Sequence, residues 1–280
     1  MYVKKNKLIG EQLNPFTNLY DKVYDYENSE NVWVEPKGFD KEHIVTNWKA
    51  ICSGSVIEIW NYQEPLFYGF DTKSDVRKGK QKVDTDFIKR RDNFIRSQFK
   101  LRRLINANVN FNSKFITLTF KENLSDISVA KYKFKKFIER MNRRRLKKKL
   151  DKLKYVYVIE FQKRGSIHFH CIFFNLGFFR NDELFKIWKY GFTKINKIDD
   201  VDNVGSYVVK YMEKSLSDSR MNGVDLYGRS KGNLEEPLVI KRPLEVKQIL
   251  KAYKNKVVFK KIYKSDYNGK IEYMQINLKR

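Results

Sequence analysis

Residues 166–173 read Ser-Ile-His-Phe-His-Cys-Ile-Phe and contain two of the chain's three histidines, His168 and His170. Because side chains alternate between the two faces of a strand, a His-x-His pair in such an apolar run projects both imidazoles to the same side. Two core histidines satisfied by neighbours are the alternative, but packing gives no reason for two polar rings on one face of this strand. Imidazole is the commonest side-chain metal ligand, so the doublet predicts one half of a metal site.

A carboxylate is predicted on the same face by the turn that precedes the histidines. Strand-like segments flank the sequence Lys163-Arg164-Gly165-Ser166, which suits a three-residue hairpin loop that ends in a left-handed glycine. Such a loop pairs Glu160 with His168 and places Glu160 on the face of both imidazoles. A two-residue loop would shift the pairing by one residue and turn Glu160 away.

A second set of reactive side chains lies on a predicted helix further along the chain. Spacings of i, i+3, i+4 and i+7 place four residues on one polar and aromatic stripe, namely Tyr207, Lys210, Tyr211 and Lys214. Asp202 or Asn203 is expected to cap this helix. An exposed face with snorkelling side chains is the alternative reading of the stripe, but the histidine hairpin upstream favours a chemical role.

Together these residues would support chemistry at a phosphate. Two imidazoles and a carboxylate leave open coordination positions on Mn²⁺ or Mg²⁺, and such an ion would polarise a non-bridging phosphate oxygen. A tyrosine hydroxyl would attack phosphorus and form a covalent phosphotyrosine. Because the reference pKa of tyrosine is about 10, the developing phenolate needs stabilisation by the metal or by a nearby cation, for which Lys210 is the candidate.

The chain is strongly basic. Its 280 residues carry 58 Lys and Arg against 33 Asp and Glu, a formal net charge of +25, which far exceeds what solubility requires. Several basic clusters in a chain with 15% aromatic residues favour phosphate contacts with base stacking, so nucleic acid rather than a membrane surface is the expected partner. The predicted DNA-binding residues are Arg90, Arg91, Arg102, Arg103, Arg143, Arg144 and Lys214.

Other features of the sequence limit the functional class. No stretch is long and apolar enough for a signal peptide or a membrane span, so a cytoplasmic protein is expected. Cys52 and Cys171 are far apart and suggest neither a disulfide framework nor a zinc cluster. The phosphate-loop pattern G-x-x-x-x-G-K-[ST] does not occur, so no ATP-driven motor is expected.

Apolar spacing and turn residues predict the elements that position these side chains. Helices are expected at 85–107, after a cap at Asp126 or Ser128, at about 182–188, from about 203 to 214 and at 244–253; strands are expected at 56–60, 115–120, 154–162, 167–174 and 192–198, with a hairpin about Tyr267-Asn268-Gly269. We divide the chain into an N-terminal extension at 1–83 of unreadable role, a central domain at 84–215, and a C-terminal linker, helix and hairpin at 216–280.

Three segments, in this order, resemble the motifs of the HUH endonucleases, specifically the rolling-circle replication initiators of small plasmids and single-stranded DNA phages. The segment Phe115-Ile116-Thr117-Leu118-Thr119-Phe120 resembles the first strand motif, Gly165-Ser166-Ile167-His168-Phe169-His170 the metal motif, and Tyr207-Val208-Val209-Lys210-Tyr211 the nucleophile motif Tyr-x-x-Lys. The resemblance covers roughly residues 110 to 215 and leaves both flanks uncovered.

The resemblance implies an α+β nuclease domain of ferredoxin or RRM-like type, with a central antiparallel sheet flanked by helices and with extensions at both ends. Such an enzyme nicks one strand at a replication origin, stays attached to the 5′ phosphate and leaves a 3′ hydroxyl for the host polymerase. A Glu one strand upstream is often its third metal ligand, and Glu160 is the matching position. Tyr207 is the first expectation for the nucleophile, although Tyr211 with Lys214 fits the motif equally and could be a second one.

The expected partners are single-stranded DNA at an origin, a host polymerase and a host helicase, since the helicase domain of many eukaryotic viral relatives is not seen in this sequence. The oligomeric state stays open. A transposase or a plasmid-mobilising relaxase of the same superfamily would use the same chemistry on other DNA. A non-catalytic nucleic-acid-binding protein, in which the histidines and tyrosines pack or stack on bases, is the alternative from another class.

Overall fold

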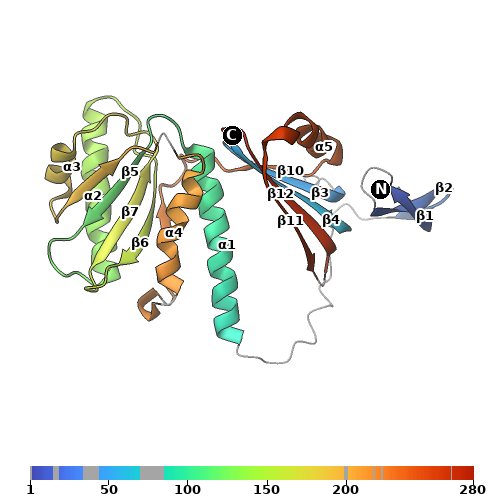
Figure 1. The fold of residues 1–280 in the computed structure, drawn as a ribbon, viewed down its shortest axis with the longest axis horizontal. Coiled ribbons are helices and arrows are strands. Elements are labelled where there is room, and N and C mark those ends of the chain that lie inside the picture. Colours follow the sequence, from blue (N-terminus) through green and yellow to red (C-terminus); the bar gives the residue numbers. More distant parts are fainter. Residues whose placement is uncertain are drawn as a thin grey trace.

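The computed structural model describes residues 2–14, 19–33, 44–69, 85–198, 201–216, 218–221, 223–265 and 267–280. The elements, in chain order, are β1 (Tyr2–Asn14), β2 (Leu19–Trp33), β3 (Ile44–Ser53), β4 (Val56–Tyr68), α1 (Thr85–Asn108), β5 (Lys114–Thr119), α2 (Ile127–Lys147), β6 (Tyr155–Phe161), β7 (Ile167–Phe173), α3 (Asn181–Trp188), β8 (Thr193–Asn196), α4 (Val204–Leu216), η2 (Ser219–Met221), β9 (Tyr227–Arg229), β10 (Leu238–Ile240), α5 (Pro243–Ala252), η3 (Lys254–Lys256), β11 (Val257–Ser265) and β12 (Gly269–Asn277). Two five-stranded antiparallel sheets lie on either side of α1 (Figure 1). The expected α+β class is confirmed.

The first sheet has the strand order β8-β5-β7-β6-β9 and is covered on both faces. Side chains of α2 and α3 pack on one face in a core that includes Phe137, Phe169 and Trp188. Side chains of α1 and α4 pack on the other face around Phe115 and Ile172. Because strand residues alternate between faces, the histidines of β7 lie on the side of α1 and α4, opposite the aromatic core.

The periodic segments of this half form the elements that their spacing predicts. The helix expected at 85–107 is α1, and the helix after Asp126 is α2, where the Asp126 carboxylate accepts hydrogen bonds from the N–H groups of Ser128 and Val129. The region 217–236 was expected to be a loop, but it contains η2 and the three-residue strand β9, which pairs with β6. A strand this short carries too few residues to show a period of two.

The second sheet has the order β10-β3-β4-β12-β11 and is therefore built from both ends of the chain. Its strands β3 and β4 come from the predicted N-terminal extension, whereas β10, β11 and β12 come from the predicted C-terminal segment. Helix α5 covers one face with a core around Ala50, Ile59 and Val246. The two terminal segments, which the sequence suggested as separate extensions, thus complete one folded unit, while β1 and β2 form an antiparallel pair of their own.

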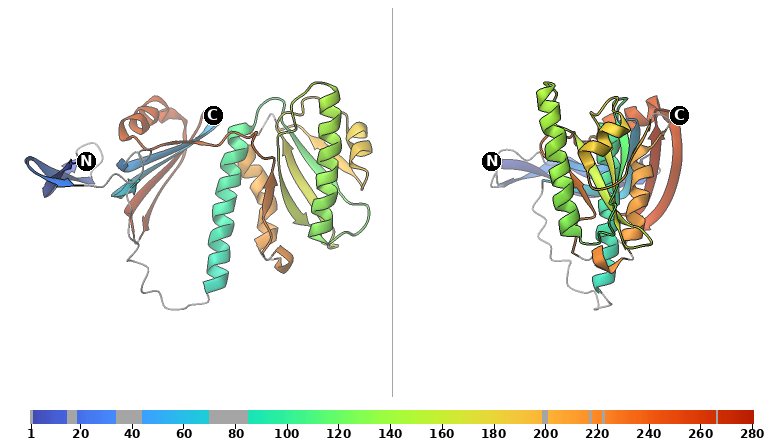
Figure 2. Two further views of the ribbon diagram at one scale, coloured as in Figure 1. Left: turned by 180° about the vertical axis from the view of Figure 1, so that it is seen from behind. Right: turned by 90° about the vertical axis from the view of Figure 1, so that its left-hand side faces the viewer.

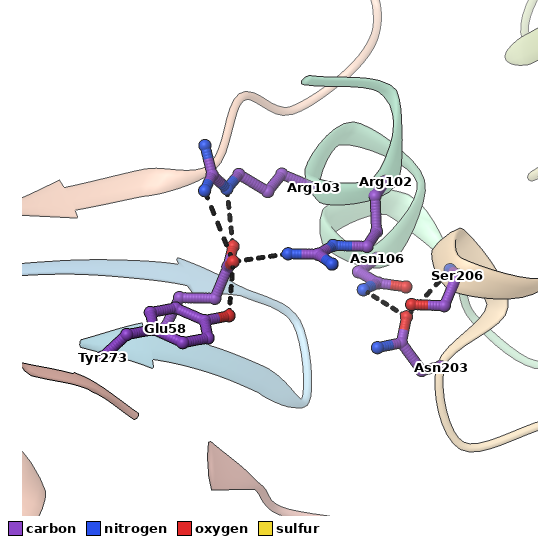
Figure 3. A network of polar contacts seen from close by, with 7 residues as sticks. All are labelled: Glu58, Arg102, Arg103, Asn106, Asn203, Ser206 and Tyr273. Atoms are coloured by element: carbon purple, nitrogen blue, oxygen red, sulfur yellow. Dashed lines mark hydrogen bonds and ion pairs between the residues drawn. The ribbon is translucent and has the colours of Figure 1, made fainter. Parts of the chain in front are cut away.

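A buried carboxylate joins the second sheet to α1 (Figure 3). Glu58 of β4 is 1% exposed, and its carboxylate accepts hydrogen bonds from Arg102 at 2.5 Å, from Arg103 at 2.5 Å and from the Tyr273 hydroxyl at 2.9 Å. Burial by itself raises the pKa of Glu58, but the bond to Arg103 and the charges of both arginines outweigh it and hold that pKa below its usual range. Charge pairing therefore stabilises the contact between the two halves.

In the part of the chain that the structure describes, no helix combines the length and the apolar character needed to cross a membrane. Figure 2 shows the same arrangement from behind and from one side, with α1 again between the two sheets.

Candidate active site

The hairpin of β6 and β7 has the register that its turn predicts. The N–H of Gln162 donates to the carbonyl of Ser166 at 2.9 Å, and Gly165 has a φ of 86°, in the left-handed region that favours glycine. Glu160 consequently lies directly opposite His168. The expectation that Glu160 shares a face with both histidines is confirmed by this pairing.

Glu160 and His170 are in direct contact. The Oε2 atom of Glu160 lies 2.5 Å from Nε2 of His170, and the two residues are only 7% and 6% exposed. On the other side of the ring, Nδ1 of His170 lies 3.4 Å from the hydroxyl of Thr117 on β5. Partners at both ring nitrogens fix the orientation of the imidazole, as hydrogen-bond partners of metal-binding histidines commonly do.

His168 lies on the same face of β7 as His170, nearer the hairpin turn. It stands between Glu160 of β6 and Thr119 of β5 in the strand register, and its Nε2 atom is buried. The ring centroids of His168 and His170 are 6.1 Å apart. Adjacent strands thus bring one carboxylate and two imidazoles to one end of the sheet.

Two tyrosines of α4 meet the histidines on this face. The ring of Tyr211 stacks on His170 with centroids 3.9 Å apart and planes inclined by 22°, and the hydroxyls of Tyr211 and Tyr207 lie 3.1 Å apart. Phe115 of β5 contacts His170 and both tyrosine rings. Tyr207 is 36% exposed, so it is the tyrosine that presents its hydroxyl to solvent at the edge of the site.

The two hydroxyls differ in their ionisation. Burial is the largest cause that raises the pKa of Tyr211 well above its usual value, followed by the hydrogen bond and the charge interaction with Tyr207 and by the charge of Glu160. Tyr211 is therefore a neutral phenol near pH 7, and its hydroxyl can donate a hydrogen bond to Tyr207.

The start of α4 is held by residues that the sequence analysis did not single out, except for the cap at Asn203. The Asn203 side chain accepts from the N–H of Ser206 at 3.0 Å and from Nδ2 of Asn106 at 2.9 Å, as Figure 3 shows. Asn106 of α1 also accepts from the N–H of Gly205 at 2.8 Å. A Cβ on Gly205 would lie 2.2 Å from the carbonyl oxygen of Arg102, so only glycine allows this close crossing of α1 and α4.

The donor atoms fit a divalent ion chemically but are not spread around a common centre. Among the described residues, no group of three or more His, Cys, Asp or Glu side chains is arranged to hold a metal ion. The direct contact of Glu160 with Nε2 of His170 occupies the space in which an ion would lie. Two imidazoles and one carboxylate on one face nevertheless form a donor set that Mn²⁺ accepts, and a small rotation of the Glu160 carboxylate would open the position.

The two lysines of the predicted stripe are not joined to the tyrosines. Lys210 is exposed, and within the described part of the chain no hydrogen bond links it to Tyr207 or Tyr211. The side chain of Lys214 lies outside the described residues. The structure therefore assigns the hydroxyl contact of Tyr207 to Tyr211, and the stabilisation of a phenolate by Lys210 stays a prediction.

The predicted DNA-binding arginines separate into two groups. The guanidinium groups of Arg102 and Arg103 are only 18% and 19% exposed and are paired with Glu58, so they hold α1 to the second sheet instead of standing open to DNA. Arg144 pairs with Glu183 at 2.5 Å. Arg91 and Arg143 are exposed, and phosphate binding stays a prediction for them. The side chain of Arg90 lies outside the described residues.

A family model for replication-associated proteins of the ORF2 type matches residues 113–216. The matched segment contains β5, the β6–β7 hairpin and α4, and thus every residue of the proposed centre. No curated protein and no solved structure matches the chain. The match supports a replication-associated protein with a role in replication initiation, and hence an interaction with DNA at an origin.

Proposed function

We propose that this chain is a metal-dependent endonuclease and strand transferase of the HUH type that nicks and rejoins single-stranded DNA to initiate rolling-circle replication. The observation that supports this proposal most is the contact of the Tyr207–Tyr211 pair with the His170–Glu160 pair on one face of the sheet. A phenol next to a buried carboxylate and two imidazoles is the set of groups that tyrosine transesterification needs. The matched replication-associated family supports an origin as the substrate.

In the proposed reaction, the Tyr207 hydroxyl oxygen attacks phosphorus of a DNA phosphodiester. A bond forms between that oxygen and phosphorus, and the bond from phosphorus to the 3′ oxygen breaks. The phenol loses its proton to solvent, and the departing 3′ oxygen takes up a proton to become a hydroxyl. Tyr207 then carries the 5′ phosphate, and attack by a 3′ hydroxyl on the same phosphorus rejoins the strand in the reverse reaction.

Tyr211 and Phe115 would position the attacking hydroxyl. The Tyr211 hydroxyl, 3.1 Å from that of Tyr207, would donate a hydrogen bond to the developing phenolate and so lower the barrier. Phe115 meets the Tyr207 ring edge-on with centroids 5.5 Å apart, which restricts its rotation. Tyr207 is the preferred nucleophile because Tyr211 is stacked against His170 and less accessible.

Glu160, His168 and His170 would hold the divalent ion, Mn²⁺ or Mg²⁺. When bound, the ion would polarise a non-bridging phosphate oxygen and orient the scissile bond. The hydroxyl of Thr117 keeps the His170 ring turned with Nε2 toward the shared position. Host polymerase and helicase remain the partners that the proposed reaction would need for extension and unwinding.

The test is a covalent-adduct assay on full-length protein with labelled single-stranded oligonucleotides that tile the replicon carrying its gene, in the presence of Mn²⁺. A denaturing gel should show a slow band that contains both protein and DNA, and peptide mapping should place the nucleotide on Tyr207. Tyr207→Phe, alone or with Tyr211→Phe, should abolish the band while DNA binding survives. Tyr132→Phe, at an exposed tyrosine of α2, is the matched control, and an undiminished adduct in the double variant would refute the assignment.

A further inference from the structure

The second sheet has a face that no helix core covers. On the three neighbouring strands β4, β12 and β11 the register places five aromatic side chains on the side opposite α5, namely Trp60, Tyr62, Tyr273, Phe259 and Tyr263. Trp60 stands directly opposite Tyr273, and Tyr62 and Tyr263 stand on either side of Ile271. Because strand residues alternate, the other face of these strands carries the residues that pack on α5.

The rings form a continuous and partly exposed row. Trp60 and Tyr273 have ring centroids 5.2 Å apart, and Tyr273 and Phe259 have centroids 6.0 Å apart. Phe259 is 48% exposed and Tyr263 is 40% exposed. Large aromatic rings at this exposure on a sheet are not needed for the core of this unit, which lies on the α5 side.

Cations stand among these rings. Lys49 and Arg103 lie over the Trp60 ring at 6.0 Å and 5.3 Å from its centroid, and Lys241 lies 3.9 Å from the centroid of Tyr68. Lys261 is exposed on β11 between Phe259 and Tyr263, opposite Tyr273 in the register.

The positive charge of this face is concentrated. Burial and the neighbouring charges of Arg103 and Lys241 lower the pKa of Lys49. The Glu58 carboxylate is buried and already paired with Arg102 and Arg103, so it does not neutralise the lysines. A polyanion would therefore be attracted to this surface.

We propose that this aromatic face of the second sheet binds single-stranded DNA, with bases stacked on the exposed rings and phosphates near the lysines. Aromatic side chains interleaved with cations on an open surface are the combination that single-strand binding uses, since every base has a face that can stack. Duplex DNA keeps its bases stacked on each other and would gain only the phosphate contacts. The site lies outside the segment 113–216 that contains the nicking residues, and it does not depend on the nicking chemistry.

The test measures binding of full-length protein to a fluorescent thymidine 30-mer and to a duplex of the same length by anisotropy. Phe259→Ala and Tyr263→Ala should each weaken binding to the single strand by about fivefold or more, the lower end of what one lost base stack costs. Ile262→Ala is the matched control, because Ile262 is 51% exposed on the same strand but on the opposite face. All three variants should leave duplex binding unchanged within about twofold.

Charge is separated from stacking by a second pair of variants. Lys261→Ala should reduce the salt dependence of single-strand binding by close to one phosphate contact, whereas Lys264→Ala, which removes the same charge from the opposite face of β11, should not. Ultraviolet crosslinking of a bromouracil-substituted strand should label peptides of β4, β11 and β12. Equal effects of the variants on the two faces of β11, or crosslinks confined to residues 113–216, would overturn the proposal. Loss of the nicking adduct in Tyr207→Phe would leave it standing.

Discussion

Replacing Glu58 by Gln should weaken the junction between the two sheets more than any other charge-removing change among the described ion pairs. The side chain of Glu58 is 2% exposed and faces two arginines. Glutamine keeps the volume and one acceptor oxygen but removes the charge. Two guanidinium groups would then lie close together in a half-buried place without a counter-charge.

The cost follows from the burial of the three groups. Removing one partner of a buried ion pair costs about 3–5 kcal/mol, because the other charge is left uncompensated. The arginines are 18% and 19% exposed, so water can rehydrate them in part. We therefore expect a loss of about 3 kcal/mol in the free energy of unfolding. Glu272→Gln is the control: its pair with Lys260 is 25% and 56% exposed, and surface pairs contribute less than about 1 kcal/mol.

The assay is urea unfolding followed by tryptophan fluorescence, repeated from pH 7 to pH 3. Because the folded-state pKa of Glu58 is lowered, its stabilisation is present above the unfolded-state pKa of about 4.3 and is lost as the pH falls through the folded value. The difference between the wild-type chain and Glu58→Gln should accordingly shrink below about pH 4. Equal losses in Glu58→Gln and Glu272→Gln, or a difference that persists unchanged at pH 3, would refute the reasoning.

Three further outcomes concern the candidate active site. Gly205→Ala should lower the melting temperature and slow adduct formation, because its Cβ would lie 2.2 Å from the Arg102 carbonyl oxygen and displace the helix that carries Tyr207; unchanged adduct kinetics would contradict this role of Gly205. Chelation with EDTA should abolish adduct formation and Mn²⁺ should restore it, whereas an adduct rate insensitive to EDTA would exclude metal dependence. Glu160→Gln should raise the Mn²⁺ concentration for half-maximal adduct formation at least about tenfold, since a charged ligand is lost, and a shift below twofold would argue against Glu160 as a ligand.

Local sequence signals predicted the part of the fold that carries the proposed centre. Gly165 marks a turn that only one register satisfies well, so the pairing of Glu160 with His168 could be derived without coordinates. The stripe of Tyr207 and Tyr211 follows from helical spacing alone. Such features depend on residues within a few positions of each other, which a single sequence displays directly.

Contacts between distant segments could not be predicted in this way. Nothing in the local pattern of β4 or β12 shows that these strands, from opposite ends of the chain, pair with each other, so the second sheet was missed as one unit. Arg102 and Arg103 appeared as a basic cluster for DNA because their partner, Glu58, lies on another element. Asn106 likewise has no motif, and only its position against Asn203 and Gly205 shows what it holds.

Anomalous diffraction from crystals of the full-length protein soaked in Mn²⁺ tests the central claim most directly. One manganese peak is predicted within coordination distance of Glu160 and of both Nε2 atoms of His168 and His170, with the Tyr207 hydroxyl facing the open side of the ion. A peak elsewhere in the molecule, or none at these three residues at saturating Mn²⁺, would contradict the account.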